Sequence, residues 1–293
     1  MTAQTAIGTT KVAVVGAGSV GATCAYACLI RGIGRTIALY DTNADKTRAE
    51  VLDLNHGLQF VPQATVVGSD DIEVCRGADL VVITAGAKQK PGQTRLELAE
   101  ANVALSRAIV PKLLEVAPDA ILLLVTNPVD VITYAALKLS GLPPQRVFGS
   151  GTVLDSSRLR LLVADHCGVA VQNVHAYIAG EHGDSEIPLW SSASIGSVPL
   201  LAWDVPGRPA LDAAAREEIH RKVIGAASSP TATSCSPARA PIRGRLNGDP
   251  ISSSGEQTRV MAAKSSKPAS PQRTSTASKP QTTPALSSVT PGP

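Results

Sequence analysis

Cysteine and aromatic residues are scarce in this 293-residue sequence, which has five cysteines and only 3% Phe, Trp and Tyr. No two cysteines form a C-x-x-C pair, and Cys24 and Cys28 have the i,i+4 spacing of one helix face. The histidines contain no H-x-x-x-H pair, and neither His175 nor His182 has a matching cysteine partner. A disulfide framework and a zinc motif are therefore disfavoured. The sequence predicts reduced thiols, a cytoplasmic protein and no bound metal.

We also expect neither a targeting segment nor a membrane-spanning segment. The N-terminus lacks the charged segment and apolar run that a secretory signal needs. Residues 12–30 are uncharged and nearly long enough to cross a bilayer. They hold three glycines at a phosphate-loop spacing together with Ser19 and Thr23, which disfavours a transmembrane helix. We expect no membrane association.

A basic surface is absent from most of the chain, although the formal net charge is +3. The residues after 227 include eight basic and two acidic side chains, so residues 1–227 carry a net charge of −3. This mildly acidic part offers no groove for the phosphates of a nucleic acid. The sequence therefore argues against a nucleic-acid partner.

Short β-branched runs alternate with amphipathic stretches through the first half of the chain. Strands are expected at residues 11–15, 36–41, 64–68, 79–86 and 121–130, the last running into a loop at Pro128. Helices are expected up to about Arg31 and at residues 44–58 and 94–116. This alternation predicts an α/β fold, a doubly wound parallel sheet with helices on both faces, over residues 1–150.

The pattern changes after about Ser150. A helix at 151–169, a strand at 174–180 and a helix at 210–227 predict the beginning of a second, α+β domain over residues 151–227. From Ser228 onward, 32 of 66 residues are Ser, Thr or Pro, and none is aromatic. Because such a segment cannot bury enough apolar surface to offset its chain entropy, residues 228–293 are predicted to be a disordered tail.

The motif GAGSVG at residues 16–21 follows the first strand and opens the first helix, the context of a dinucleotide-binding turn. Gly16 permits a tight turn, Gly18 lets the backbone approach a diphosphate, and Gly21 allows close packing of helix and sheet. Asp41 ends the next strand, where its carboxylate would accept hydrogen bonds from a ribose and repel a 2′-phosphate. These residues predict NAD as the cofactor, in preference to NADP; an incidental glycine turn is the alternative.

Four more motifs follow in order: AKQKPGQTRLEL (87–98), VTNPVD (125–130), LDSSRLR (154–160) and GEHGDSE (180–186). With them, residues 10–227 resemble the lactate/malate dehydrogenase family, and in particular its bacterial lactate branch. The resemblance implies interconversion of pyruvate and (S)-lactate in glycolysis or fermentation. A malate or other 2-hydroxyacid dehydrogenase and a catalytically inactive NAD-binding remnant remain alternatives.

The resemblance also implies roles for individual side chains. His182 would donate a proton to the substrate carbonyl oxygen, and Asp155 would hold its imidazole and stabilise the protonated form. Arg158 would bind the substrate carboxylate through a two-pronged pair, which suits guanidinium geometry. Arg95, in a polar loop suited to being a lid, would polarise the carbonyl. Asn127 would orient substrate and nicotinamide. By itself His182 could be structural, and only the joint occurrence of the motifs favours a proton carrier.

Gln89 indicates which substrate is preferred. In the malate branch the matching position is arginine, which pairs with a second carboxylate, whereas a neutral amide favours a monocarboxylate such as pyruvate. The resemblance further implies a homotetramer and binding of fructose 1,6-bisphosphate, an allosteric activator, at Arg160 and His175. The remaining cofactor contacts that it implies are Val20, Lys46, Gly86, Ala87, Val125 and Ser150.

The chain departs from the family after Ala227, where a Lys-Gly-Ala-Thr segment, more sheet and a long helix would follow. One hypothesis is a frameshift, because one choice of codons for residues 235–241, shifted by two bases, encodes Leu-Ala-Arg-Lys-Gly-Ala. Coincidence is the alternative, and the coding DNA across codons 224–241 distinguishes the two. Either way, the departure predicts impaired catalysis, since the family's substrate-contacting threonine lies in the replaced segment.

Overall fold

A computed structural model describes residues 10–87, 92, 94–204, 207 and 210–226. All of them fall in the first of two compact units, Met1–Arg239. The predicted tail, residues 228–293, and Gln89 in the predicted lid lie outside the described residues, as does the side chain of Arg95.

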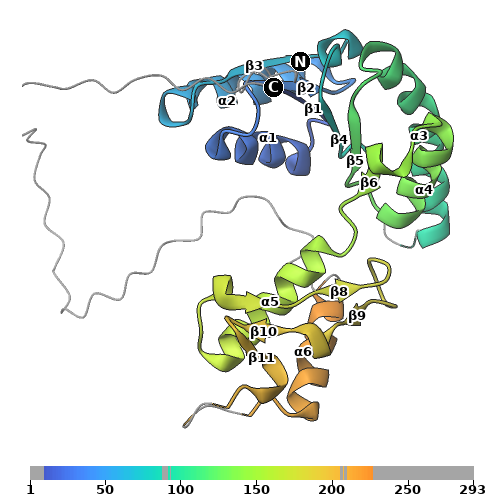
Figure 1. Ribbon diagram of the computed structural model, residues 1–293. Helices are drawn as coiled ribbons and strands as arrows, with labels where there is room; N and C mark the ends of the chain where they lie inside the picture. The colour runs from blue at the N-terminus through green and yellow to red at the C-terminus, as the bar shows by residue number, and fades with distance from the viewer. Residues whose placement is uncertain (1–9, 88–91, 93, 205–206, 208–209, 227–293) are drawn as a thin grey trace, which may run out of the picture. The chain divides into compact units, whose positions relative to one another are not determined.

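Six parallel strands form the sheet of the first domain, in the order β3-β2-β1-β4-β5-β6 (Figure 1). They are β1 (Lys11–Val15), β2 (Thr36–Tyr40), β3 (Thr65–Ser69), β4 (Leu80–Ile83), β5 (Ile121–Leu124) and β6 (Val147–Gly149). The order reverses between β1 and β4, which are direct neighbours. The doubly wound parallel sheet expected from the sequence is therefore confirmed.

Helices cover both faces of this sheet. Successive strand residues point to opposite faces, so each face has its own apolar side chains that a helix must cover. Val12 and Val14 of β1 pack with α1 (Ser19–Arg31) and α2 (Ala44–His56). Ala13 and Val15 pack with α3 (Arg95–Val116) and α4 (Val129–Ser140), which lie side by side in Figure 1. Two separate apolar clusters result, one on each face.

Local sequence signals set several helix ends. Thr94 caps α3, its hydroxyl accepting from the Glu97 amide while the Glu97 carboxylate accepts from the Thr94 amide. These hydrogen bonds also lower the pKa of Glu97 below its usual value. Gly32 ends α1 in the left-handed conformation, with φ of 65°.

Helix α4 and strand β6 were not expected from the sequence. The prediction placed a loop at Pro128, but this residue is the N-cap of α4. Proline interrupts a strand because it lacks an amide hydrogen, yet its fixed φ suits the start of a helix. The sequence therefore predicted an interruption of the strand at Pro128, but it did not predict that a helix begins there.

The second domain has its own apolar cluster, built from α5 (Val153–Cys167), α6 (Ala213–Gly225) and short strands. One antiparallel sheet has the order β11-β10-β7, and a second pairs β8 with β9. These strands are β7 (Val174–His175), β8 (Ile178–Ala179), β9 (Ile187–Pro188), β10 (Ser194–Ile195) and β11 (Val198–Pro199). Single 3₁₀ turns occur at Leu58–Phe60, Ile72–Cys75, Pro144–Arg146, Val171–Asn173, Trp190–Ser192 and Leu200–Ala202.

The single strand expected at residues 174–180 is divided between these two sheets. Side chains of α5 bind the backbone at the division: Arg160 Nε donates to the carbonyl of Ala176 at 2.8 Å, and Ser156 Oγ accepts from the amide of Ile178 at 2.9 Å. These groups are therefore satisfied by a helix instead of a neighbouring strand. Among the described residues, no helix is both long and apolar enough to span a membrane.

Candidate functional site

The predicted cofactor residues lie at the carboxyl ends of the parallel strands. Gly16, Gly18, Val20 and Gly21 follow β1; Asp41 and Lys46 follow β2; Gly86 and Ala87 follow β4; Val125 and Asn127 follow β5; and Ser150 follows β6. Parallel strands end at one edge of a sheet, so five separate segments meet there. The order reverses at β1 and β4, and this reversal is where such sheets bind their ligands.

The glycine-rich turn fits a dinucleotide diphosphate. Gly16 has φ of 106°, and a Cβ there would approach Ala85 N to 2.7 Å. A Cβ on Gly21 would overlap the carbonyl oxygen of Gly16. Beside Gly18, in contrast, nothing lies within 4 Å of an added Cβ. Gly16 and Gly21 thus permit close packing, while Gly18 leaves open space before the N-terminus of α1, where free amides favour an anion.

Asp41 is tied to this turn. Its Oδ2 accepts from the Ala17 amide at 2.7 Å, and its Oδ1 accepts from the Asn43 amide at 3.0 Å. Each carboxylate oxygen has further lone pairs, so Asp41 can both shape the turn and accept from a ribose hydroxyl. Lys46 and Val20 are exposed on the first turns of α2 and α1.

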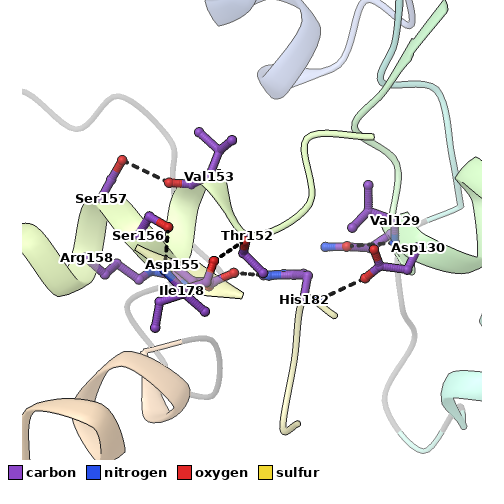
Figure 2. A network of polar contacts seen from close by, with 11 residues as sticks. Val129, Asp130, Thr152, Val153, Asp155, Ser156, Ser157, Arg158, Ile178 and His182 are labelled. Atoms are coloured by element: carbon purple, nitrogen blue, oxygen red, sulfur yellow. Dashed lines mark hydrogen bonds and ion pairs between the residues drawn. The ribbon is translucent and has the colours of Figure 1, made fainter. Parts of the chain in front are cut away.

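Two predicted catalytic side chains and one predicted substrate-binding side chain form a cluster in the second domain (Figure 2). Asp155 Oδ2 lies 2.6 Å from His182 Nδ1, and Arg158 Nη1 donates to Asp155 Oδ1 at 3.1 Å. The Asp155 side chain is 2% exposed, against 20% for His182 and 24% for Arg158. One buried carboxylate therefore positions an imidazole and a guanidinium, both of them partly exposed.

Helix geometry explains why Asp155 and Arg158 lie together in this cluster. Asp155 and Arg158 are three residues apart on α5, so they lie on one face of the helix. The N-cap residue of the same helix binds the segment that leads to His182, because Thr152 Oγ1 donates to the Ile178 carbonyl at 2.7 Å. His182 also contacts the first domain: its backbone amide donates to Asp130 Oδ2 at 2.8 Å.

Glu186 is a buried carboxyl group near this cluster. The residue is 4% exposed, and Oε1 has no hydrogen-bond partner among the described residues. Burial, chiefly, and the negative charge of Asp155 raise the pKa of Glu186, while His182 and Arg158 oppose the increase. The described residues contain no group of three His, Cys, Asp or Glu side chains suited to a metal ion.

The two predicted allosteric residues are also neighbours. Arg160 binds the carbonyl of Ala176, the residue next to His175, and its guanidinium carbon lies 4.6 Å from the centre of the Tyr177 ring. His175 is exposed on β7. Arg160 is therefore fixed to the backbone at the residue that follows the exposed His175.

Sequence reasoning missed three polar residues at or near the site: Asn102, Asp130 and Glu186. Asn102 was hidden within a helix interpreted by its apolar spacing, although a polar residue on a buried face is itself a signal. Asp130 and Glu186 lay inside quoted motifs, but only the tertiary structure reveals their contacts and burial.

Comparison with known proteins identifies the family. The model of the lactate/malate dehydrogenase NAD-binding domain matches residues 10–149, and the model of the family's α/β C-terminal domain matches residues 152–230. The chain belongs to the lactate/malate dehydrogenase family. Its first domain is the NAD-binding domain of this family, and the residues beyond 230 lie outside both matches.

Individual relatives of the lactate/malate dehydrogenase family agree with this assignment. The chain is 60% identical to an L-lactate dehydrogenase of Bifidobacterium animalis subsp. lactis, over 74% of this chain and 68% of the relative. It is 52% identical to L-lactate dehydrogenase B of Hordeum vulgare, over 74% of this chain and 63% of the relative. A solved lactate dehydrogenase from a Medee basin deep-sea metagenome superposes with a TM-score of 0.70 at 41% identity, over 76% of this chain and 70% of that one. The chain is therefore homologous to L-lactate dehydrogenases, and its matches span about two thirds of their length.

Proposed function

We propose that this chain carries the catalytic apparatus of an NAD-dependent L-lactate dehydrogenase, which interconverts pyruvate and (S)-lactate. The observation that carries the proposal is the cluster in which Asp155 binds both His182 and Arg158. Reduction of a 2-keto acid needs a proton donor beside a cation that holds the carboxylate, and this cluster supplies both from one support.

Each residue has a defined task in the reduction of pyruvate. NADH, when bound, supplies the hydride that becomes the new C–H bond. Asp155 accepts from Nδ1 of His182 and stabilises the imidazolium, so Nε2 is the nitrogen that transfers its proton to the carbonyl oxygen. Arg158 pairs with the substrate carboxylate, and its bond to Asp155 fixes the orientation of the guanidinium. The products are lactate, NAD⁺ and neutral His182.

Three further residues complete the proposed substrate site. Arg95, the first residue of α3, polarises the carbonyl, and Gln89, which lies outside the described residues, favours a monocarboxylate. Asn127 follows β5 at the edge where the cofactor residues gather, in agreement with a contact to both substrate and nicotinamide. Asp41 discriminates against NADP because its carboxylate repels a 2′-phosphate.

A second candidate function is NAD binding without turnover. The family match ends at residue 230, and the residues that follow differ in composition from a folded domain. If the replaced segment supplies part of the substrate wall, the first domain still binds cofactor while the reaction stalls. The two functions share the same cofactor site and differ only in the second domain.

Steady-state NADH oxidation tests the proposal. The full chain is compared with a frame-restored chain, in which the family reading frame continues after Ala227, using pyruvate and oxaloacetate as substrates. Pyruvate-dependent oxidation that His182→Asn abolishes, with NADH affinity kept, supports L-lactate dehydrogenase. Preference for oxaloacetate indicates a malate dehydrogenase. NADH binding without turnover in either chain indicates the NAD-binding remnant.

Regulation and assembly form a further part of the proposal. Arg160 and His175 bind a phosphate of fructose 1,6-bisphosphate, supported by their adjacency and by the cation fixed over Tyr177. Large apolar side chains exposed on α5, among them Val153, Leu154 and Leu161, support association into a homotetramer. The free thiols of the described cysteines agree with a cytoplasmic location.

A further inference from the structure

Asn102 lies between two loops that carry proposed cofactor and substrate residues. It is on α3 and is 1% exposed, which is rare for a carboxamide unless its polar atoms are bonded. Its Oδ1 accepts from the Ala87 amide at 2.7 Å, and its Nδ2 donates to the Asn127 carbonyl at 2.7 Å. One side chain therefore joins the segment after β4 to the segment after β5.

Chemistry fixes the orientation of this carboxamide. If its oxygen and nitrogen were exchanged, an NH₂ group would face the Ala87 N–H and an oxygen would face the Asn127 carbonyl, so both contacts would become repulsive. The site thus requires one acceptor and one donor at the two ends of a short side chain. Aspartate supplies only acceptors when ionised, and leucine supplies neither.

The surrounding packing leaves little room for these segments to separate or shift. Thr126 Oγ1 donates to the Ala85 carbonyl at 2.7 Å. A Cβ on Gly86 would overlap the Thr126 side chain and approach Asn102 Oδ1 to 3.3 Å. The two loop stems are therefore in direct contact, and the Asn102 carboxamide forms the polar part of that contact.

The Asn127 loop continues toward the catalytic cluster. Asn127 Oδ1 accepts from the Val129 amide at 3.3 Å at the start of α4, and the next residue, Asp130, binds the backbone amide of His182. Figure 2 shows Val129, Asp130 and His182 at this end of the network. A displacement of the Asn127 carbonyl would therefore also shift the proposed nicotinamide contact and the His182 backbone.

We propose that Asn102 is a positioning residue, which holds the Ala87 and Asn127 loop stems at the separation that cofactor binding requires. It acts through Ala87 and Asn127 and touches neither cofactor nor substrate. Its consequence for NADH affinity depends on the proposed function, whereas its effect on the Ala87 amide does not.

The pair of hydrogen bonds from Asn102 to Ala87 and Asn127 forms a clamp. Amide hydrogen exchange of the full 293-residue chain tests this clamp directly. Asn102→Leu removes the acceptor for the Ala87 amide, so that amide should exchange about tenfold faster, within the range expected for one lost hydrogen bond. Ser106→Ala is the matched control, because it removes a buried bond of 2.9 Å from the Ser106 hydroxyl to the Asn102 carbonyl on the same helix. The control should leave the Ala87 amide within about twofold of the wild type. An Ala87 amide that exchanges equally in all three proteins overturns the clamp.

NADH affinity, measured by fluorescence titration of the same chains, tests the positioning role. Asn102→Leu should bind NADH on the order of tenfold more weakly, and Ser106→Ala should bind it normally. Asn102→Asp should bind weakly at pH 8 and recover as the pH falls. Burial raises the pKa of a carboxyl group, and the protonated acid regains a donor for the Asn127 carbonyl. The ratio of the NADH affinity of Asn102→Asp to that of the wild type, taken at each pH, isolates this effect.

The outcomes separate the inference from the proposed function. Faster Ala87 exchange with unchanged NADH affinity overturns the positioning role. A pH-independent defect in Asn102→Asp overturns it as well, because a purely steric or folding defect would not respond to protonation at this site. If wild type binds NADH but turns over neither keto acid, the proposed activity fails while the clamp and its role in cofactor binding stand.

Discussion

Asp155→Asn should separate the two tasks of the catalytic cluster. The native carboxylate accepts from His182 Nδ1 at 2.6 Å and from Arg158 Nη1 at 3.1 Å, and it is 2% exposed. An amide of the same shape has one oxygen and one NH₂ group. It can therefore accept from only one of these two donors, and its NH₂ group repels the other.

The size of the effect follows from these two bonds. A hydrogen bond to a charged group contributes about 1.5–3 kcal/mol, so the loss of one of the two costs about 1.5–3 kcal/mol. At about 1.4 kcal/mol per factor of ten, kcat/KM for pyruvate should fall on the order of 10- to 100-fold. Loss of the bond to His182 should impair proton transfer and lower kcat. Loss of the bond to Arg158 should weaken carboxylate binding and raise KM.

The assay is pyruvate-dependent NADH oxidation by the frame-restored chain, together with NADH titration. Asp165→Asn is the matched control, because Asp165 is an exposed acid on the same helix. In the full chain, proton NMR provides a readout that needs no turnover: the wild type should show a low-field resonance from the proton shared by His182 and Asp155. This resonance should be absent from Asp155→Asn.

Two results would refute this reasoning. A kcat/KM within about threefold of wild type would show that the cluster does not support catalysis. A parallel loss of NADH affinity and thermal stability would show that Asp155 acts in folding, since the predicted cofactor contacts lie in the other domain.

Four other predictions concern different parts of the chain. Glu186→Gln should raise the melting temperature at neutral and alkaline pH but not near pH 4. The pKa of Glu186 is raised on folding, so the contribution of this carboxyl group to the free energy of unfolding is present below the unfolded pKa and is lost as the pH rises through the folded pKa. A melting temperature whose pH dependence is the same in both proteins contradicts this. Gly21→Ala should destabilise the first domain by roughly 1–3 kcal/mol and weaken NADH binding, because the added Cβ overlaps the Gly16 carbonyl; unchanged denaturant midpoints would refute the packing argument. In the frame-restored chain, Gln89→Arg should shift the kcat/KM ratio from pyruvate toward oxaloacetate, and an unmoved ratio would remove Gln89 from the substrate pocket. The full chain should have at least 100-fold less pyruvate activity than the frame-restored chain, since a misplacement of about 1 Å costs on the order of 100-fold; family-typical turnover by the full chain would contradict this.

Much of the first domain could be predicted from the sequence, because its signals are local. The Val-rich strands, the glycine turn and Asp41 at the end of β2 depend on periodicity and on a short motif that needs glycine. Elements without a distinctive local pattern were missed: β6 has only three residues, and Pro128 was read as an end when it is a beginning. The 174–180 segment looked like one strand because its division depends on bonds from α5, about 20 residues earlier in the chain.

The residue types of the candidate site were also predictable, but their geometry was not. His182, Asp155 and Arg158 were selected by their motifs, and the structure adds that a single buried carboxylate joins them. Asn102 and Glu186 could not be assigned in the same way. A hydrogen bond between residues 15 or 25 positions apart leaves no periodicity in the sequence, and burial depends on elements that pack from elsewhere.

The sequence by itself determined the class of fold, the cofactor turn and the chemical groups available for reaction, since each depends on neighbouring residues along the chain. Only the tertiary structure decided which side chains meet. It brought the ends of five strands to one edge and placed Asn102 between two of the loops there. It also buried one carboxyl oxygen of Glu186 with no hydrogen-bond partner in the part of the chain that the structure describes. The physical reason is that local patterns fix backbone conformation, whereas contacts between distant residues depend on how the completed elements pack.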